Sequence, residues 1–300
     1  MRARVVALAG ALIAAGCGSA SSNHSARVQG TLEALARGPG LKTVALTPGD
    51  ADFSPGPLRY SFLVVAADGH VVAKPSAEVW ISRGYKQKPY QRTTARLETI
   101  AGPGSSDDLP APAIYVAHLR APSPGTYWVL ARPVGARIGG LGNVVVRSRS
   151  YSPEVGAKVP ASTTPTLSST KGKLAPLTTA AHPDRQLYRT SVGQALAAHV
   201  PFVVTFATPK FCTSRTCGPV VDVVSRVRKQ LSHSGVRFIH VEVYEHNDPS
   251  QGYNRWMRQW GLQSEPWVFL VGRDGTVKAK FEGPLSVGEL RSAVVSHLVD

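Results

Sequence analysis

The chain has 300 residues, enough for two modest domains, and its hydrophobic fraction of 43% can supply their cores. The formal net charge of +15 is high, but the lysines and arginines are scattered along the sequence. Because no run of them is dense enough to form a nucleic-acid-binding arm, the charge indicates a solvated basic surface, and no nucleic acid is expected as a partner.

The N-terminus has the features of an export signal. Arg2 and Arg4 precede a short apolar segment at residues 5–15. Its length suits a signal peptide and is too short for a membrane-spanning helix. These features predict an exported protein. No other segment of the sequence is long and apolar enough to span a bilayer.

The signal ends in Leu12-Ile13-Ala14-Ala15-Gly16-Cys17, which resembles a bacterial lipobox. The resemblance implies cleavage before Cys17 and a lipid anchor on its sulfur. It therefore predicts a lipoprotein on the cell membrane that faces outside the cytoplasm. Ala14 stands where a lipobox usually has leucine, and cleavage near Ala20 followed by secretion is the alternative.

Residues 18–40 are rich in serine, alanine and glycine, which predicts a flexible tether. Residues 41–150 show short strand-like runs separated by Gly/Pro turns, typical of a β-sandwich. The segment 124–129, Pro-Gly-Thr-Tyr-Trp-Val, resembles the strand entry of immunoglobulin-like extracellular modules. This domain contains no evident catalytic constellation, and we expect it to act as a spacer or to bind a partner. The predicted strands are residues 58–66, 71–73, 77–82, 113–119, 125–131 and 144–147.

Residues 151–183 are rich in serine, threonine and proline, which predicts an extended linker. From residue 184 to 300, helical and strand-like patterns alternate. Apolar runs predict strands, helical spacing predicts amphipathic helices, and Ser286 with Glu289 forms a capping-box pattern before the last helix. The predicted strands are residues 202–206, 236–244, 267–271 and 276–281, and the main predicted helices are residues 191–199, 219–234 and the segment that follows Ser286.

The most informative stretch is residues 202–220, where a buried strand leads through a loop with Cys212 and Cys217 into a helix. Free N–H groups and the positive dipole end of a helix stabilise a thiolate and lower its pKa. The sequence has three cysteines, so lipidation of Cys17 would leave these two as an isolated pair in an oxidising compartment. Redox chemistry is therefore plausible at this loop.

This order of elements resembles the thioredoxin family over residues 184–300. The resemblance rests on the cysteine pair between a strand and its helix, on Pro266 before an apolar strand and on Gly283 after the following strand. It implies an α/β fold with a central mixed sheet flanked by helices, beside the N-terminal immunoglobulin-like sandwich. It also implies that Pro266 is cis and packs against the cysteines.

The loop departs from the family pattern Cys-Gly-Pro-Cys, because four residues separate Cys212 from Cys217. Either Cys212 is the nucleophile and Cys217 resolves the mixed disulfide, or Cys217-Gly218-Pro219-Val220 occupies the motif position. We favour the first alignment, since the exposed cysteine normally precedes the helix.

A second departure concerns the proton acceptor. The family commonly has a buried aspartate near the end of the first strand, where this chain has Thr205 and its uncharged neighbours. Glu265, directly before Pro266, is the candidate acid near the cysteines. It would either relay a proton or, through its charge, raise a thiol pKa.

These features predict a membrane-anchored, extracytoplasmic thioredoxin-like protein that exchanges thiols and disulfides with exported proteins. Its predicted site residues are Cys212, Cys217, Pro266 and Glu265, with Cys17 as the lipidation site, and no cofactor is expected. Two alternatives remain. One is a binding protein with a structural Cys212–Cys217 disulfide, and the other is a copper-handling protein that uses His240 or His246. The substrate, the direction of electron flow and the oligomeric state are not predicted.

Overall fold

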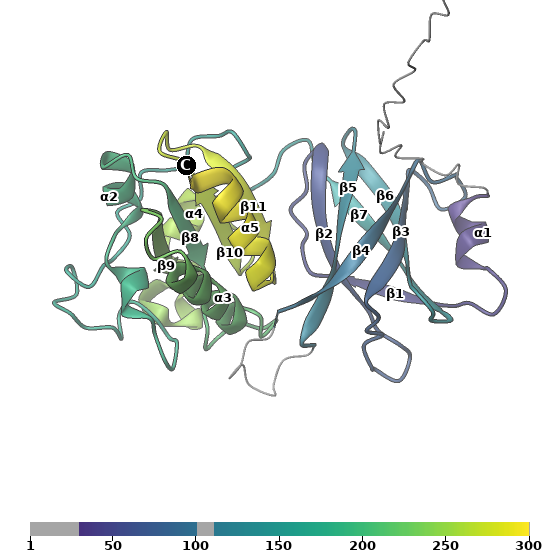
Figure 1. Ribbon diagram of the computed structural model, residues 1–300, viewed down its shortest axis with the longest axis horizontal. Coiled ribbons are helices and arrows are strands. Elements are labelled where there is room, and N and C mark those ends of the chain that lie inside the picture. Colours follow the sequence, from purple (N-terminus) through teal and green to yellow (C-terminus); the bar gives the residue numbers. More distant parts are fainter. Residues whose placement is uncertain (1–29, 101–110, 300) are drawn as a thin grey trace, which may run out of the picture.

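The computed structural model describes residues 30–100 and 111–299, which form two adjoining units (Figure 1). The N-terminal unit is a closed β-barrel, and the C-terminal unit is built on a separate four-stranded sheet. The predicted signal peptide and its lipidation site, Cys17, lie outside the described residues. Within the described ranges, no helix combines the length and the apolar character that a membrane span requires.

The barrel contains seven strands in the spatial order β1-β2-β5-β4-β3-β6-β7. Aromatic side chains fill its interior, where Tyr60, Phe62 and Tyr115 stack on one another beside buried Tyr127. A short helix, α1 (Leu32–Ala36), packs on the outside against Trp80. The strands are β1 (Lys42–Pro48), β2 (Gly56–Val64), β3 (Ser76–Ser82), β4 (Gln91–Thr99), β5 (Ala113–Ala121), β6 (Gly125–Pro133) and β7 (Ile138–Val146).

Strand β1 closes the barrel because it pairs with two partners. Its first half is parallel to β7, and its second half is antiparallel to β2. Gly140 in β7 permits this approach, since a Cβ there would lie 3.1 Å from Val64 and 3.3 Å from Leu46. The predicted immunoglobulin-like sandwich is therefore wrong, because one continuous sheet curls until its edges meet.

The C-terminal sheet has the order β11-β10-β8-β9. Strands β8 and β9 are parallel, and the other pairs are antiparallel. Two helices, α3 (Cys217–Gln230) and α5 (Val287–Leu298), lie side by side on one face (Figure 1). The strands are β8 (Phe202–Phe206), β9 (Arg237–Val241), β10 (Trp267–Val271) and β11 (Val277–Glu282).

The opposite face of this sheet is covered mainly by irregular chain. Its helices α2 (Val192–Ala197) and α4 (Arg255–Gln259) span only six and five residues. Val159, Trp260 and Leu262 complete the core on this side. The 3-10 turns are η1 (Arg185–Tyr188), η2 (Glu245–Asn247) and η3 (Pro249–Gln251).

The predicted fold class is therefore corrected in both halves. The chain is mainly β, with eleven strands and five mostly short α-helices in the described residues. It contains a closed barrel and a separate small sheet, and not an α/β core flanked by helices beside a sandwich. In the C-terminal unit, the reason is that irregular backbone packs on one face of the sheet where helices were expected.

Residues 151–183, predicted as a linker, contain no α-helix or named β-strand. Several of their side chains are nevertheless buried against the C-terminal sheet, including Val159 on one face and Leu177 on the other. The domain boundaries expected around this segment stay a prediction.

Polar contacts join the barrel to the C-terminal unit. Arg59 of β2 donates from Nε and Nη2 to the two carboxylate oxygens of Glu289, at 2.6 and 2.9 Å, and from Nη2 to the Pro284 carbonyl at 2.7 Å. The Glu282 carboxylate accepts from the backbone nitrogens of Ala51 and Asp52, both at 2.7 Å. These contacts place one outer wall of the barrel beside the end of β11 and the start of α5.

Candidate functional site

The cysteine loop turns back on itself between β8 and α3. The backbone nitrogen of Arg215 donates to the Cys212 carbonyl at 3.1 Å, and Arg215 has a φ of 59°, in the left-handed region. This turn brings the Cys212 sulfur to 3.3 Å from the backbone nitrogen of Cys217, the first residue of α3. Residues five positions apart therefore share one site at a helix N-terminus, and both cysteines are free thiols.

Hydrogen bonds stabilise the ionised form of Cys212. The Cys217 side chain is the strongest contributor, followed by the hydroxyl of Ser214, 3.2 Å from the sulfur, and by the N–H groups of Cys217 and Thr216. Together they outweigh partial burial and lower the pKa of Cys212 to about 6. Cys212, which is partly exposed, is therefore mainly a thiolate near neutral pH.

Cys217 has the opposite character. Its side chain is fully buried, and burial strongly raises its pKa. Donation of its proton toward Cys212 and the negative charge of that sulfur raise the pKa further. The pair therefore consists of an accessible thiolate and a buried thiol, which are the two states that sequential thiol–disulfide exchange requires.

Glu265 and Pro266 lie directly before strand β10, opposite the cysteine loop. The Glu265–Pro266 peptide bond is cis, as the family resemblance implied. The Glu265 carboxylate accepts hydrogen bonds from the hydroxyls of Tyr253 at 2.5 Å and Tyr244 at 3.4 Å. Its charge also contributes to the raised pKa of Cys217. The structure thus places Glu265 within electrostatic reach of the buried thiol.

Of the two histidines considered as copper ligands, His240 has other partners, and His246 lies in the 3-10 turn η2. His240 is buried, its Nδ1 lies 2.8 Å from the Tyr188 hydroxyl, and its Nε2 lies 3.0 Å from the Ala207 carbonyl. Among the described residues, no group of three or more His, Cys, Asp or Glu side chains is arranged to hold a metal ion.

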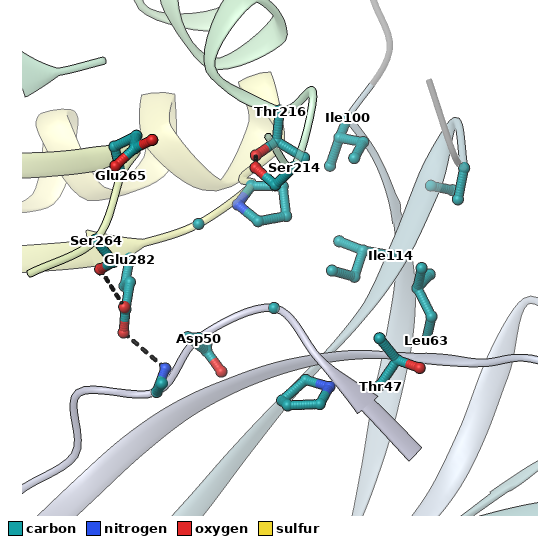
Figure 2. Close-up of a pocket in the computed structure, with 17 residues that line it drawn as sticks. Thr47, Asp50, Leu63, Ile100, Ile114, Ser214, Thr216, Ser264, Glu265 and Glu282 are labelled. Carbon is teal, nitrogen blue, oxygen red and sulfur yellow. Dashed lines mark hydrogen bonds between the residues drawn. The ribbon is translucent and has the colours of Figure 1, made fainter. Parts of the chain in front are cut away.

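A cavity of about 370 Å³ lies beside the cysteine loop, between that loop and the barrel (Figure 2). Ser214 and Thr216 of the loop line it, and their hydroxyls are 2.8 Å apart. Glu265 also lines it, so the cavity borders both the cysteine loop and the segment before β10. The remaining lining residues come from the barrel and its loops, from the segment before β10, and from the end of β11 and the residues after it: Thr47, Pro48, Gly49, Asp50, Ala51, Leu63, Ile100, Ala111, Ala113, Ile114, Ser264, Glu282, Gly283 and Pro284.

Sequence reasoning proposed the cysteines, Glu265 and Pro266 as candidates, but it missed the groups that contact them. Ser214 was recognisable in principle as a hydroxyl within the loop. Tyr244 and Tyr253, which donate to Glu265, face each other in an isolated antiparallel bridge, and their pairing was not evident from spacing. No sequence signal connected Leu63 or Ile114 of the barrel to the cysteine loop.

The comparisons with known proteins add a limited likeness. No protein-family model matches the chain, and the search of curated proteins found no match. One solved structure, a thiol:disulfide interchange protein of the thioredoxin family from Chlorobium tepidum TLS, aligns with 33% of this chain and 81% of its own. The identity is 19% and the TM-score 0.28, so this likeness is weak and partial.

Proposed function

We propose that the protein exchanges thiols and disulfides through Cys212 and Cys217. The observation that carries this proposal is the placement of two cysteines at the start of α3, with the partly exposed Cys212 sulfur 3.3 Å from the backbone nitrogen of buried Cys217. The pKa of partly exposed Cys212 falls to about 6, while burial raises the pKa of Cys217. A purely structural pair has no need of a stabilised thiolate on one side, whereas exchange begins with one.

The reaction has two balanced steps. In the first, the Cys212 thiolate attacks one sulfur of a substrate disulfide, and the other substrate sulfur leaves as a thiolate and takes a proton from water. In the second, Cys217 loses its proton to solvent and attacks the Cys212 sulfur. A Cys212–Cys217 disulfide forms, and the first substrate sulfur leaves. Two electrons have then passed to the substrate, and an external dithiol must reduce the pair again.

Formation of the mixed disulfide removes the negative charge from Cys212. That charge is one cause of the raised pKa of Cys217, so its loss makes Cys217 more acidic at the moment when it must react. Glu265 then remains as a negative neighbour held by Tyr244 and Tyr253. We propose that Glu265 raises the pKa of Cys217 both before and after this step, so that loss of the Cys212 charge is what allows Cys217 to react.

The location of this reaction is part of the proposal and rests on the N-terminal sequence. Arg2, Arg4 and the apolar segment before Cys17 support export, with a lipid on Cys17 and exported proteins as substrates. Metabolic labelling with a fatty-acid analogue tests this point. The native chain should carry the label in the membrane fraction, and Cys17→Ser should not. An unlabelled native chain would contradict the lipid anchor without affecting the cysteine chemistry.

Trapping of the mixed disulfide tests the chemistry. The full-length Cys217→Ser variant should accumulate an adduct at Cys212 when it meets a peptide disulfide, because the resolving thiol is missing. The native protein should release the peptide and form the Cys212–Cys217 disulfide. Mass spectrometry distinguishes these products, and Cys212→Ser is the matched control that should form no adduct.

The reduction potential of the pair separates exchange from a structural disulfide. Structural disulfides typically have potentials below about −300 mV, whereas labile pairs lie higher. We expect a value above that limit. A lower potential, combined with no adduct in Cys217→Ser, would rule out the proposed exchange.

A further inference from the structure

We propose that the cavity between the barrel and the cysteine loop binds an apolar side chain of the polypeptide whose disulfide Cys212 attacks. This inference rests on the proposed exchange reaction and adds the substrate class. It gives the barrel a part in substrate selection. The argument depends on the position of the cavity, on the chemistry of its two walls and on the contacts that hold those walls together.

The cavity is continuous with the surroundings of the nucleophile. Ser214 lines the cavity, and its hydroxyl lies 3.2 Å from the Cys212 sulfur. A substrate cysteine bonded to Cys212 would therefore sit at the rim. Consecutive Cα atoms are about 3.8 Å apart, so a residue one or two positions from that cysteine reaches the cavity.

The two walls of the cavity differ in chemistry (Figure 2). The barrel contributes Leu63, Ile100 and Ile114, which belong to one apolar cluster on its outer surface. The C-terminal unit contributes hydroxyls and carboxylates, including Ser214 and Glu265. Ligand pockets commonly combine an apolar lining with a few polar groups that orient the ligand. The barrel wall thus matches an apolar side chain, and the opposite wall faces the reacting sulfur.

The carboxyl groups around the cavity favour a neutral substrate. Asp50, Glu265 and Glu282 all line it. Glu282 already accepts from Ser264 at 2.6 Å and from two backbone nitrogens, and Glu265 accepts from two tyrosines. An anionic small disulfide would meet like charge from these carboxylates. An uncharged peptide segment avoids this repulsion and buries its apolar side chain on the barrel wall.

The cavity is held open by a close junction at its edge. Gly283 has a φ of 70°, and a Cβ on it would lie 2.0 Å from the Gly49 carbonyl oxygen. The two backbones therefore touch at a point where no side chain fits. Together with the Arg59–Glu289 pair, this contact fixes the barrel wall relative to the cysteine loop. A preformed cavity of about 370 Å³ is at the small end of ligand pockets and is large enough for a side chain.

Two peptides that differ at one position test the proposal. Each carries a cysteine as a mixed disulfide with thiopyridine, followed by leucine in one peptide and serine in the other. Release of thiopyridone reports the rate of attack by full-length native protein. We expect the leucine peptide to react about tenfold faster, since a few methyl groups in an apolar pocket change rates by that order.

Variants of the barrel wall identify where the preference arises. Ala113→Leu fills the cavity and Leu63→Ser removes part of its apolar wall, and both should bring the two peptides to within about twofold of each other. Val145→Ser, at an exposed barrel position outside the cavity lining, should keep the native preference. The rate with bis(2-hydroxyethyl) disulfide, which is small, neutral and hydrophilic, is measured for every variant as a reference. That rate confirms an intact Cys212 and a folded loop.

The outcomes separate this inference from the proposed reaction. Equal rates for the two native reactions, or an unchanged preference in both Ala113→Leu and Leu63→Ser, would overturn the substrate site. Failure of the native protein to react with bis(2-hydroxyethyl) disulfide as well as with both peptides would instead contradict the exchange reaction itself.

Discussion

Arg59 of the barrel and Glu289 of the last helix form a two-pronged ion pair, with N···O distances of 2.6 and 2.9 Å. The Arg59 side chain is only 11% exposed, and Asp50 lies 3.2 Å from it on the barrel side. The pair therefore joins the two units through a largely desolvated contact. Because the same junction borders the cavity beside Cys212, its integrity has consequences for both stability and reactivity.

Loss of Arg59 should destabilise the protein strongly. Arg59→Met leaves the carboxyl groups of Asp50 and Glu289 without their counter-ion, and breaking a buried pair costs about 3–5 kcal/mol. Urea unfolding of the full chain measures the change. Arg92→Met is the matched control, because Arg92 pairs with Glu78 at a more exposed site and such pairs contribute about 0–1 kcal/mol. Equal losses in the two variants would contradict a special role for Arg59.

Asp50 should make stability fall as the pH rises toward neutrality. Burial raises its pKa from 3.8 to about 7 in the folded chain, although Arg59 opposes the shift. The folded state then binds the proton more tightly, so this contribution is fully present below about pH 4 and is lost as the pH rises through about 7. Between about pH 5 and pH 8, the free energy of unfolding should decrease by about 3 kcal/mol.

Urea unfolding of two variants tests whether Asp50 causes this slope, the fall in the free energy of unfolding with rising pH. Asp50→Asn should remove it. Asp52→Asn should leave it intact. Burial of Asp52 acts to raise its pKa, but hydrogen bonds from Ser150, Tyr151 and Ser152 lower the pKa overall. Asp52 is therefore ionised throughout this range. A slope that persists in Asp50→Asn would assign the pH dependence to another group.

Gly283→Ala should disrupt the junction between the units. The added Cβ would lie 2.0 Å from the Gly49 carbonyl oxygen, which only backbone movement can relieve. Gly235→Ala is the matched control, because Gly235 has a similar φ of 76° and nothing within 4 Å of its Cβ position. The free energy of unfolding should fall by about 1–2 kcal/mol in the control, because alanine is disfavoured in the left-handed conformation. It should fall by clearly more in Gly283→Ala. Comparable urea midpoints would show that the contact is unimportant.

Ser214→Ala should weaken the Cys212 thiolate. The Ser214 hydroxyl lies 3.2 Å from the sulfur and helps to lower the pKa of Cys212 to about 6. Without this hydrogen bond, we expect the pH midpoint of Cys212 alkylation to rise by about one unit, which is about 1.4 kcal/mol. The pH profile of iodoacetamide labelling measures it, and Ser168→Ala, at an exposed serine, should keep the native midpoint. An unchanged midpoint in Ser214→Ala would remove Ser214 from the site.

Glu265→Gln should make the second step of exchange possible at lower pH. The charge of Glu265 contributes to the raised pKa of Cys217, so its removal lowers that pKa and increases the thiolate fraction at a given pH. Stopped-flow release of a peptide from Cys212 reports this step. Asp68→Asn, which removes a charge from an exposed position, should leave the profile unchanged. A slower step at every pH would instead favour Glu265 as the proton acceptor.

Local sequence patterns predicted many individual elements. The apolar run at residues 202–206 is strand β8, and Trp267–Val271 is strand β10, as expected. The predicted capping box forms in part: the Ser286 hydroxyl accepts from the backbone nitrogen of Glu289 at the start of α5, whereas the Glu289 carboxylate accepts from Arg59. In each case, the neighbouring residues themselves supply the signal, either through alternation, continuous apolarity or a capping pair.

Other elements gave no such signal. Strand β1 is mostly exposed or half-buried, with Leu46 as its one fully buried residue, so it lacks the alternation that marks a strand. Strand β4 was missed because two of its inward-facing residues, Gln91 and Thr93, are polar, so its alternation in burial is not an alternation in hydrophobicity. Without these two strands, closure of the barrel was not foreseeable, and a sandwich was the natural expectation.

The sequence by itself determined the cysteine loop, the helix that follows it and the proline before β10, because these features are encoded in adjacent residues. Only the tertiary structure decided that Cys212 and Cys217 differ in ionisation, since that difference arises from burial and from hydrogen bonds with Ser214 and the start of α3. It likewise decided that Leu63 and Ile114 border the same cavity as Ser214. Contacts between residues about 100 to 150 positions apart depend on how complete sheets and helices pack, and no local pattern records them.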